Sequence, residues 1–448
     1  MKQQLFGTDG VRGPYGTAQM NEPLAWRLGA GAAAWVKQRP DIRSARVIIG
    51  RDTRASGPAL EAALAAGLTA GGLQPVSLGV VPSPAVSLLT RHEQAALGAV
   101  ITASHNPAGD NGIKFFGPAG LKLPDAEEAK IAGLMPAQPR PPLALTPPSQ
   151  EGLALYTDTA LSLLPAGSLR GWKIAVDAAN GAACRSTPDV LRRLGAELSL
   201  LGVAPDGTNI NAGVGSQHPE ALSAAVRSQG GRLGIAHDGD ADRCVLCDET
   251  GGVLDGDELL TILALHALAQ GRLVKNTLVI TVQSNLGVDA AVQAAGGRVC
   301  RSAVGDRYVI ERMLAEGATL GGESSGHVIC SEISSTGDGL VAALKVIGVM
   351  LATGQPLSRL RRQLRKFPQL TAALTVREKK PLENLAALSA AIAAAQADLG
   401  TQGRVLVRYS GTETKLRLLV EGPADDTVRT HLTRLIAATR ADLDVLAV

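Results

Sequence analysis

The chain has 448 residues, too many for one hydrophobic core, and this length predicts three or four domains. Hydrophobic residues make up 45% of the chain and aromatic residues only 2%, which is typical of a globular protein and argues against a nucleic-acid surface built on stacked rings. Lys and Arg number 44 against 41 Asp and Glu, and this near balance argues against a general polyanion binder.

The start of the chain, Met1 to Gly7, lacks the apolar core of a signal peptide, and no apolar run is long enough to span a bilayer. The five cysteines are scattered and odd in number, unlike a disulfide framework. Cys244 and Cys247 form a C-x-x-C in an apolar, strand-like run, where alternation places their side chains on opposite faces. We therefore expect two buried thiols instead of a redox pair or zinc knuckle, in a protein of the reducing cytoplasm without a membrane or nucleic-acid partner.

One pattern recurs three times along the chain, over about residues 46–79, 173–202 and 278–305. Each copy is an apolar run, a polar loop, a helix that ends at glycine, and a second apolar run. Such β-α-β units predict α/β domains with largely parallel sheets. Ligands bind such sheets beyond the carboxyl ends of the strands, so the polar loops are where chemistry is expected.

The chain after the repeats changes character near Phe367-Pro368. A strand, an Ala-rich helix from Leu385 to Leu399, a strand pair and a terminal helix predict a smaller α+β domain. The predicted fold is therefore three related βαβ-type α/β domains with mixed sheets and one α+β C-terminal domain. We place the predicted domains at residues 1–151, 152–254, 255–367 and 368–448.

The first candidate site is Thr102-Ala103-Ser104-His105-Asn106-Pro107, directly after an apolar run. Alone, this segment is an ordinary turn sequence. Beside a metal loop, Ser104 becomes a candidate nucleophile, because a serine hydroxyl needs a base or must arrive already phosphorylated.

Such a metal loop is predicted at Asp238-Gly239-Asp240-Ala241-Asp242-Arg243. Three carboxylates at alternate positions can curl round one cation, and hard oxygen ligands suit Mg²⁺ or Ca²⁺. An EF-hand is the rival interpretation. It requires Gly where Arg243 stands and flanking helices where the sequence predicts strands.

A G-x-S-x-G sequence at residues 322–326 raises a hypothesis of another reaction class, a serine hydrolase that uses Ser324. That elbow needs a helix directly after it, whereas the following residues look extended. We instead expect Glu323, Ser325 and His327 to alternate along an extended segment and share one face, where they suit sugar hydroxyls.

The last candidate segment runs from Arg408 to Arg417 and holds two arginines, several hydroxyls and a glycine turn. These groups predict a phosphate cradle of main-chain N–H groups and guanidinium forks. A non-enzymatic sugar-phosphate binding module would need only this segment and Glu323 with Ser325, and would not use Ser104 beside a metal loop.

These four segments, in this order, resemble the α-D-phosphohexomutase superfamily from end to end. The opening Phe6 to Gly13 and the loop Val304 to Tyr308 are most similar to the bacterial phosphoglucosamine mutases. Ala241 stands where this superfamily usually has Gly, and the methyl group suits that position if its φ is negative.

The resemblance implies a role for each matched residue. Ser104 is implied as the phosphoserine, and Mg²⁺ as the ion bound by Ser104 through its phosphate and by Asp238, Asp240 and Asp242. The polar residues implied around the phosphoserine are Arg12, His105, Lys114 and Arg243. The residues implied to bind the sugar and its distal phosphate are Glu323, Ser325, His327, Arg408, Ser410, Gly411, Thr412 and Arg417.

The reaction implied is the interconversion of glucosamine 6-phosphate and glucosamine 1-phosphate, through glucosamine 1,6-bisphosphate. Its product feeds UDP-N-acetylglucosamine and cell-wall synthesis. The expected partner is a small-molecule phosphosugar, and the expected assembly is a homodimer. Thr102 is more common in the related phosphomannomutase/phosphoglucomutase branch, which is the alternative activity.

Overall fold

The computed structural model describes residues 5–7, 9–410 and 414–447, and these form two compact units. The first unit comprises Met1–Gln283 and Ala295–Gln363. The second comprises Ser284–Ala294 and Leu364–Val448. The domain boundaries predicted from the sequence stay predictions.

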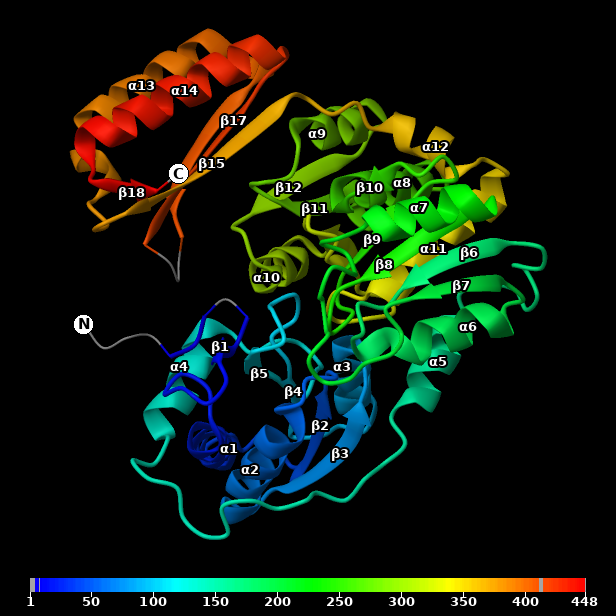
Figure 1. The fold of residues 1–448 in the computed structure, drawn as a ribbon, viewed down its shortest axis with the longest axis vertical. Coiled ribbons are helices and arrows are strands. Elements are labelled where there is room, and N and C mark those ends of the chain that lie inside the picture. Colours follow the sequence, from blue (N-terminus) through cyan, green and yellow to red (C-terminus); the bar gives the residue numbers. More distant parts are fainter. Residues whose placement is uncertain (1–4, 8, 411–413, 448) are drawn as a thin grey trace. The chain divides into compact units, whose positions relative to one another are not determined.

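The first sheet of the first unit has the strand order β1-β5-β4-β2-β3 (Figure 1). Strand β2 is parallel to β3 and β4, whereas β5 is antiparallel to β4 and β1. Helices α1 and α2 pack against each other, and their apolar side chains share a core with this sheet. The strands are β1 Val11–Pro14, β2 Arg46–Arg51, β3 Gln74–Val80, β4 Leu97–Ile101 and β5 Asp110–Phe116, and the helices are α1 Glu22–Lys37, α2 Gly57–Ala70, α3 Ser83–His92 and α4 Asp125–Leu134.

The second sheet repeats this arrangement in the order β10-β9-β8-β6-β7. Strand β6 is parallel to β7 and β8, and β9 is antiparallel to β8 and β10. The strands are β6 Lys173–Asp177, β7 Glu197–Leu201, β8 Leu233–His237, β9 Cys244–Cys247 and β10 Val253–Leu254, and the helices are α5 Leu153–Leu161, α6 Ser186–Arg193 and α7 Glu220–Gln229.

The third sheet has the order β12-β11-β13-β14, with β11 parallel to both neighbours and β14 antiparallel to β13. Its strands are β11 Thr277–Thr281, β12 Arg298–Ser302, β13 Leu320–Gly322 and β14 Val328–Cys330, and the helices are α8 Gly256–Ala269, α10 Asp306–Glu316, α11 Gly339–Thr353 and α12 Leu357–Leu360. The predicted threefold repeat and the α/β fold class are confirmed.

One connection has the same place in all three sheets: the loop between the third parallel strand and its antiparallel neighbour. In the first sheet it is the β4–β5 loop with Ser104, and in the second the β8–β9 loop with the three aspartates. In the third it is the β13–β14 loop, residues 323–327. In each sheet the first parallel strand lies between the second and the third, so the chain crosses from one side of that strand to the other. Ligands bind α/β sheets at such a switch of strand order.

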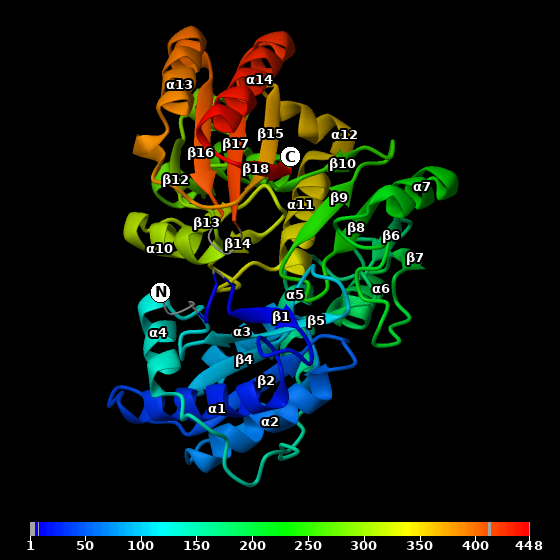
Figure 2. The same ribbon diagram turned by 60° about the vertical axis from the view of Figure 1, so that its left-hand side comes forward.

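The second unit contains an antiparallel sheet of order β16-β17-β15-β18 with two long helices, an α+β arrangement. Figure 2 shows α13 and α14 together on one face of this sheet, and their apolar side chains share a core with it. The strands are β15 Gln369–Val376, β16 Arg404–Tyr409, β17 Lys415–Glu421 and β18 Val445–Ala447, and the helices are α9 Leu286–Ala294, α13 Ala386–Leu399 and α14 Asp425–Asp442.

Among the described residues, no single helix has the length and apolarity needed to cross a bilayer. Helix α11 reaches that length only together with Leu357–Gln363, across a bend of 92°. All five cysteines carry free thiols, and Cys244 and Cys247 are buried in β9 as predicted.

Candidate active site

Ser104 lies in the β4–β5 loop and is fully buried. Its backbone has a φ of 52°, in the left-handed region, and its N–H donates to Thr102 Oγ1 at 2.8 Å. The Ser104 hydroxyl donates to Asp238 Oδ2 at 2.6 Å, across to the second sheet. The loop geometry therefore aims the candidate nucleophile at the candidate metal loop.

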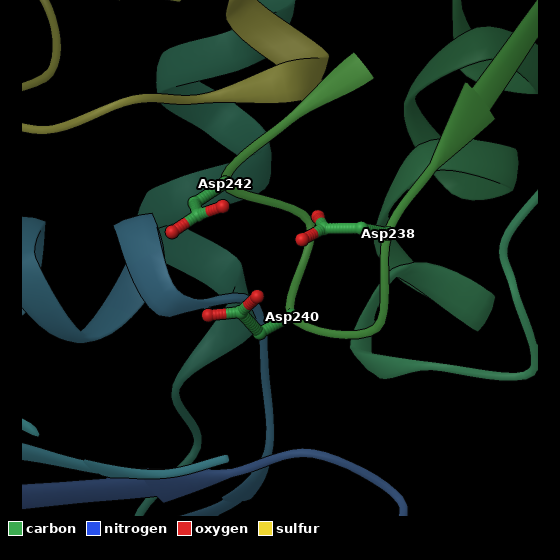
Figure 3. Close-up of side chains that lie close together, drawn as sticks. All are labelled: Asp238, Asp240 and Asp242. Carbon is green, nitrogen blue, oxygen red and sulfur yellow. The ribbon is translucent and has the colours of Figure 1, made fainter. Parts of the chain in front are cut away.

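The metal loop connects β8 and β9, so its flanks are strands and the EF-hand interpretation does not apply. Asp238, Asp240 and Asp242 are buried, and one oxygen from each lies within 4.8 Å of the others. Figure 3 shows the three carboxylates turned toward one another from a single curved loop. Gly239 is required inside this loop, because a Cβ there would lie 2.5 Å from the Ser104 carbonyl oxygen.

The donor set fits a hard divalent cation. Asp240 Oδ1 and Asp242 Oδ1 are buried and have no hydrogen-bond partner among the described residues, which is costly for a charged group in the absence of a cation. Carboxylate oxygens are hard ligands, and hard divalent cations prefer oxygen ligands. The sequence alone identified all three residues.

Lys114, on β5, forms ion pairs with two of the three aspartates. Its Nζ lies 2.6 Å from Asp240 Oδ2 and 3.3 Å from Asp242 Oδ2, and its side chain is 2% exposed. Burial alone lowers the pKa of Lys114, but Asp240, Asp9 and Asp242 outweigh burial and raise it. The lysine therefore remains charged among the carboxylates.

The two outer aspartates of the loop have opposite pKa shifts. Burial, with the charges of Asp242 and Asp240, raises the pKa of Asp238 to about 8. Burial also opposes ionisation of Asp242, but Lys114, His327 and Arg243 together lower its pKa to about 2. The raised pKa of Asp238 indicates that the neighbouring protein cations do not neutralise all three carboxylates.

His105 and Arg243 lie beside Ser104. Arg243 Nη1 donates to His105 Nδ1 at 3.0 Å, and that nitrogen is 3.4 Å from Ser104 Oγ. Burial, followed by the charges of Arg243 and Arg12, lowers the pKa of His105 to about 4. The imidazole is therefore neutral near pH 7, and its Nδ1 accepts a hydrogen bond from Arg243.

The expected extended segment at Glu323, Ser325 and His327 is wrong. The chain turns sharply there: Gly326 N–H donates to the Glu323 carbonyl at 3.1 Å, and Gly326 has a φ of 91°. A Cβ at Gly326 would lie 2.1 Å from the Cys244 carbonyl oxygen, so packing against β9 fixes the turn. Strand β14 follows this turn, so the helix that a Ser324 nucleophile elbow needs does not follow Ser324 in the described chain.

The turn brings one of its predicted residues close to the three aspartates and a second against the Val304–Tyr308 loop. His327 is buried, and its Nε2 lies 3.8 Å from Asp242 Oδ2. Glu323 Oε1 accepts from Gly305 N–H at 2.9 Å, which joins the turn to the Val304–Tyr308 loop. Ser325 is exposed at the tip.

The predicted phosphate cradle lies in the second unit. Arg408 on β16 and Arg417 on β17 are directly opposite in the antiparallel register, so their side chains project from the same face. Ser410 follows β16 and is buried, whereas the predicted residues Gly411 and Thr412 lie outside the described residues.

Sequence reasoning missed two polar residues of the cluster. Asp9 forms ion pairs with Arg12 and with Lys122, the latter at 2.5 Å, and the pKa of the Asp9 carboxyl is well below its ordinary value because these cations and Lys114 outweigh its burial. Ser83, at the start of α3, donates its hydroxyl to Asp240 Oδ2 and its N–H to the Asp240 carbonyl. Asp9 belongs to the opening motif Phe6 to Gly13, so the sequence offered a reason to consider it. Ser83 belongs to none of the motifs.

The condition stated for a methyl group at Ala241, a negative φ, is not met. Ala241 has a φ of 59°, the region that glycine enters most easily. The methyl group is buried against Ala178 and Ala183.

Four domain families match consecutive parts of the chain. They are described as the α/β/α domains I, II and III and the C-terminal domain of phosphoglucomutase/phosphomannomutase, and they match residues 3–140, 154–252, 255–367 and 372–438.

Full-length relatives are also similar to the chain. It is 47% identical over 443 residues to the phosphoglucosamine mutase of Symbiobacterium thermophilum, covering 97% of each chain. It is 49% identical over 427 residues to the phosphoglucosamine mutase of Moorella thermoacetica, covering 94% of this chain and 95% of that one. A solved phosphoglucomutase/phosphomannomutase family protein from Burkholderia thailandensis, 22% identical, has the same fold, with a TM-score of 0.82 over 99% of this chain and 100% of that one.

Proposed function

This chain belongs to the phosphoglucosamine mutases, isomerases of the phosphohexomutase superfamily, and from that membership we propose that it interconverts glucosamine 6-phosphate and glucosamine 1-phosphate. The observation that carries the proposal is the contact of Ser104 Oγ with Asp238 Oδ2, 2.6 Å apart in a buried cluster of three aspartates. A phosphate on Ser104 would lie against that cluster and the cations around it.

In the proposed reaction, phosphorylated Ser104 gives its phosphoryl group to the sugar O1 hydroxyl. The bond from phosphorus to Ser104 Oγ breaks as the bond to O1 forms, and the proton lost by O1 balances the one gained by Ser104 Oγ. The resulting 1,6-bisphosphate turns round in the site, and its 6-phosphoryl group returns to Ser104. The sugar leaves as the 1-phosphate, and the phosphorylated enzyme is restored.

Asp238, Asp240, Asp242 and the Ser104 phosphate are the proposed ligands of Mg²⁺. When bound, this ion supplies positive charge that stabilises the transferring phosphoryl group. A phosphoserine carries about −1.5 to −2 charges near neutral pH, so three adjacent carboxylates require several cations. Lys114, which touches two of the aspartates, is well placed to balance this charge, together with the neighbouring arginines Arg12 and Arg243.

The sugar and its distal phosphate require separate groups. Glu323, Ser325 and His327 are proposed to bind sugar hydroxyls, because they share one turn whose His327 lies 3.8 Å from Asp242. Two substrate orientations also require a site for whichever phosphate is not reacting. For that role we propose the segment that contains Arg408, Ser410, Gly411, Thr412 and Arg417, supported by the paired arginines of β16 and β17.

The substrate assignment is tested by kcat/KM of purified, phosphorylated protein for three phosphosugars. One charge-assisted hydrogen bond to the C2 ammonium is worth roughly 1.5–3 kcal/mol, and each 1.36 kcal/mol is about tenfold in rate. We expect glucosamine 6-phosphate to exceed glucose 6-phosphate by at least about tenfold, with mannose 6-phosphate poorer still. Equal or better turnover of glucose or mannose phosphates would instead assign the phosphomannomutase/phosphoglucomutase activity.

Three further expectations belong to the same proposal. The product would feed UDP-N-acetylglucosamine and cell-wall synthesis, and the enzyme would act in the cytoplasm. The four domains predicted from the sequence would each carry one of the four motifs. The assembly would be a homodimer, which sedimentation of the purified protein tests.

A further inference from the structure

Two carbonyl oxygens of the Ser104 loop are each held by the same two side chains. The Ser104 carbonyl accepts from Arg54 Nη2 at 3.0 Å and from Asn211 Nδ2 at 2.9 Å. The Asn106 carbonyl accepts from Arg54 Nη2 at 2.8 Å and from Asn211 Nδ2 at 3.1 Å. We name this arrangement of Arg54 and Asn211 on the two carbonyls the carbonyl clamp.

Arg54 reaches the loop from the neighbouring strand of the first sheet, because it follows β2. It is 1% exposed, and its guanidinium also donates to the carbonyls of Pro107 and Asp110, the latter at 2.9 Å. Its Nε donates to Asp52 Oδ2 at 2.9 Å, an oxygen that also accepts from Thr102 Oγ1 at 2.7 Å. Every N–H group of the guanidinium is thus directed at this loop or at the carboxylate beside it.

Asn211 reaches the same carbonyls from the second sheet's side of the site. Its backbone has a φ of 60°, and its N–H donates to the Ala179 carbonyl at 2.9 Å, so the side chain starts from a fixed position. A Cβ at Gly239 would lie 2.5 Å from the Ser104 carbonyl and 3.1 Å from Asn211 Nδ2. The clamp therefore meets the metal loop at the Ser104 carbonyl.

The position of Ser104 Oγ depends on this backbone. Ser104 has a φ of 52°, which a serine does not hold without constraint from its surroundings. The clamp fixes the peptide groups that follow Ser104 and Asn106, and therefore the direction in which the Ser104 side chain leaves the loop. That direction is toward Asp238 Oδ2, at 2.6 Å.

We propose that Arg54 and Asn211 are positioning residues that hold the phosphorylated Ser104 in line for transfer, acting through the loop carbonyls. This inference rests on the proposed function. Among the contacts of the described residues, both side chains donate to carbonyl oxygens of the Ser104 loop and neither donates to Asp238, Asp240 or Asp242, so their effect is on the placement of the transferred group.

The cleanest test is Asn211→Gly, which removes the side chain and keeps the positive φ available. Asn276→Gly is its matched control, since Asn276 is an exposed asparagine of the first unit with a φ of 49°. Losing two hydrogen bonds of ordinary strength predicts a fall in kcat of about tenfold to a hundredfold for Asn211→Gly, with KM for glucosamine 6-phosphate within about threefold. The Asn276→Gly variant should keep both constants.

A second variant, Arg54→Lys, keeps the positive charge beside Asp52 and loses the forked donors. Its control is Arg51→Lys, three residues earlier on β2, where the arginine pairs with Glu61 at 2.9 Å. We expect Arg54→Lys also to lower kcat and to leave KM for glucosamine 6-phosphate nearly unchanged. Intact mass checks that Ser104 is phosphorylated, and Tm checks that the variant is folded.

The outcomes separate this inference from the proposed function. A parent-like kcat for Asn211→Gly, or a raised KM with unchanged kcat, overturns the carbonyl clamp while the parent's mutase activity stands. A loss of kcat that tracks an equal loss of Tm in both members of a pair also overturns it, because the role would be structural. A parent that does not convert glucosamine 6-phosphate counts against the proposed function itself.

Discussion

Ser104 and Ser324 are two serines in motif-like loops with opposite expected behaviour. Ser104→Ala removes the proposed phosphate donor, so we expect mutase turnover to fall below detection while Tm stays close to that of the parent. Ser324→Ala should be mild, because the turn that follows Ser324 leads into β14 and not into a helix. A coupled assay of glucosamine 1-phosphate formation measures both, and an active Ser104 variant beside a dead Ser324 variant would contradict the assignment of Ser104 as the phosphate donor.

Ala241 shows two opposed effects at one residue. An alanine with a φ of 59° is strained by about 1–2 kcal/mol relative to glycine. Its buried methyl contributes about 0.8 kcal/mol, and glycine would add about 0.5–1 kcal/mol of chain entropy to the unfolded state. These terms nearly cancel, which accounts for alanine at a position where glycine is usual.

We therefore expect Ala241→Gly to change the free energy of unfolding by less than about 1 kcal/mol. The β-branched variant Ala241→Val should be clearly destabilised, because valine tolerates a positive φ least. Thermal unfolding of both variants gives the answer. A large gain in stability from glycine would mean that the methyl packing contributes little.

Helix α11 begins at a buried carboxylate whose ionisation opposes folding. Asp338 accepts from Val341 N–H at 3.0 Å and from the Tyr156 hydroxyl at 2.9 Å, but burial outweighs these bonds and raises its pKa to about 6. The folded state thus holds this proton more tightly than the unfolded chain does. Stability from this group is present below pH 4 and is lost as pH rises through about 6.

Asp338→Asn should remove that pH dependence and keep a good helix cap. From pH 5 to pH 7.5 the free energy of unfolding of the variant should rise by about 1–2 kcal/mol relative to that of the parent, because asparagine does not ionise. Urea unfolding of parent and variant at the two pH values measures how the difference between their free energies of unfolding changes with pH. A constant offset between parent and variant would contradict the assignment of the titration to Asp338.

The strand pair β16–β17 should act on binding more than on chemistry. If Arg408 and Arg417 hold the non-reacting phosphate in both substrate orientations, their contact persists from the bound substrate to the transition state. Arg417→Ala should then raise KM with little change in kcat, since uniform binding is lost. Steady-state kinetics that instead show a fall in kcat at constant KM would assign this arginine to the transferring phosphoryl group.

The predictable elements are those specified by local pattern. Apolar runs that end in polar loops gave the three repeats, and therefore the loops of Ser104 and Asp238. The turn at Glu323–His327 could not be predicted, because alternating polar residues also suit a strand, and the contact that enforces the turn is between Gly326 and the distant Cys244 carbonyl. The role of Arg54 could not be predicted for a related reason. Its partners are carbonyl oxygens, which every residue has, so the sequence holds no side-chain pattern for this contact.

At the scale of the whole molecule, the proposed cation should stabilise one unit and not the other. Its three aspartates all belong to the first unit. A ligand at a hundredfold its Kd adds about 2.7 kcal/mol to the stability of the unit that binds it. We expect a chelator to lower the Tm of the first unit by several degrees and to leave the second unit's transition in place.

Differential scanning calorimetry with MgCl2 or with chelator provides this measurement, and Asp240→Asn provides the control that should respond little to either. Equal shifts of both transitions would show that the cation acts elsewhere. A parent that is insensitive to chelator would contradict the proposed metal site.

The second unit is assembled from two separated stretches of chain, Ser284–Ala294 and Leu364–Val448. The N–H of Leu286 donates to Glu421 Oε1 at 2.7 Å, across 135 residues of sequence. At about 5–20 residues per second, the ribosome makes the second partner on the order of ten seconds after the first. During that interval α9 can leave the exit tunnel without this neighbour, so the helix offers a nascent-chain chaperone time to bind.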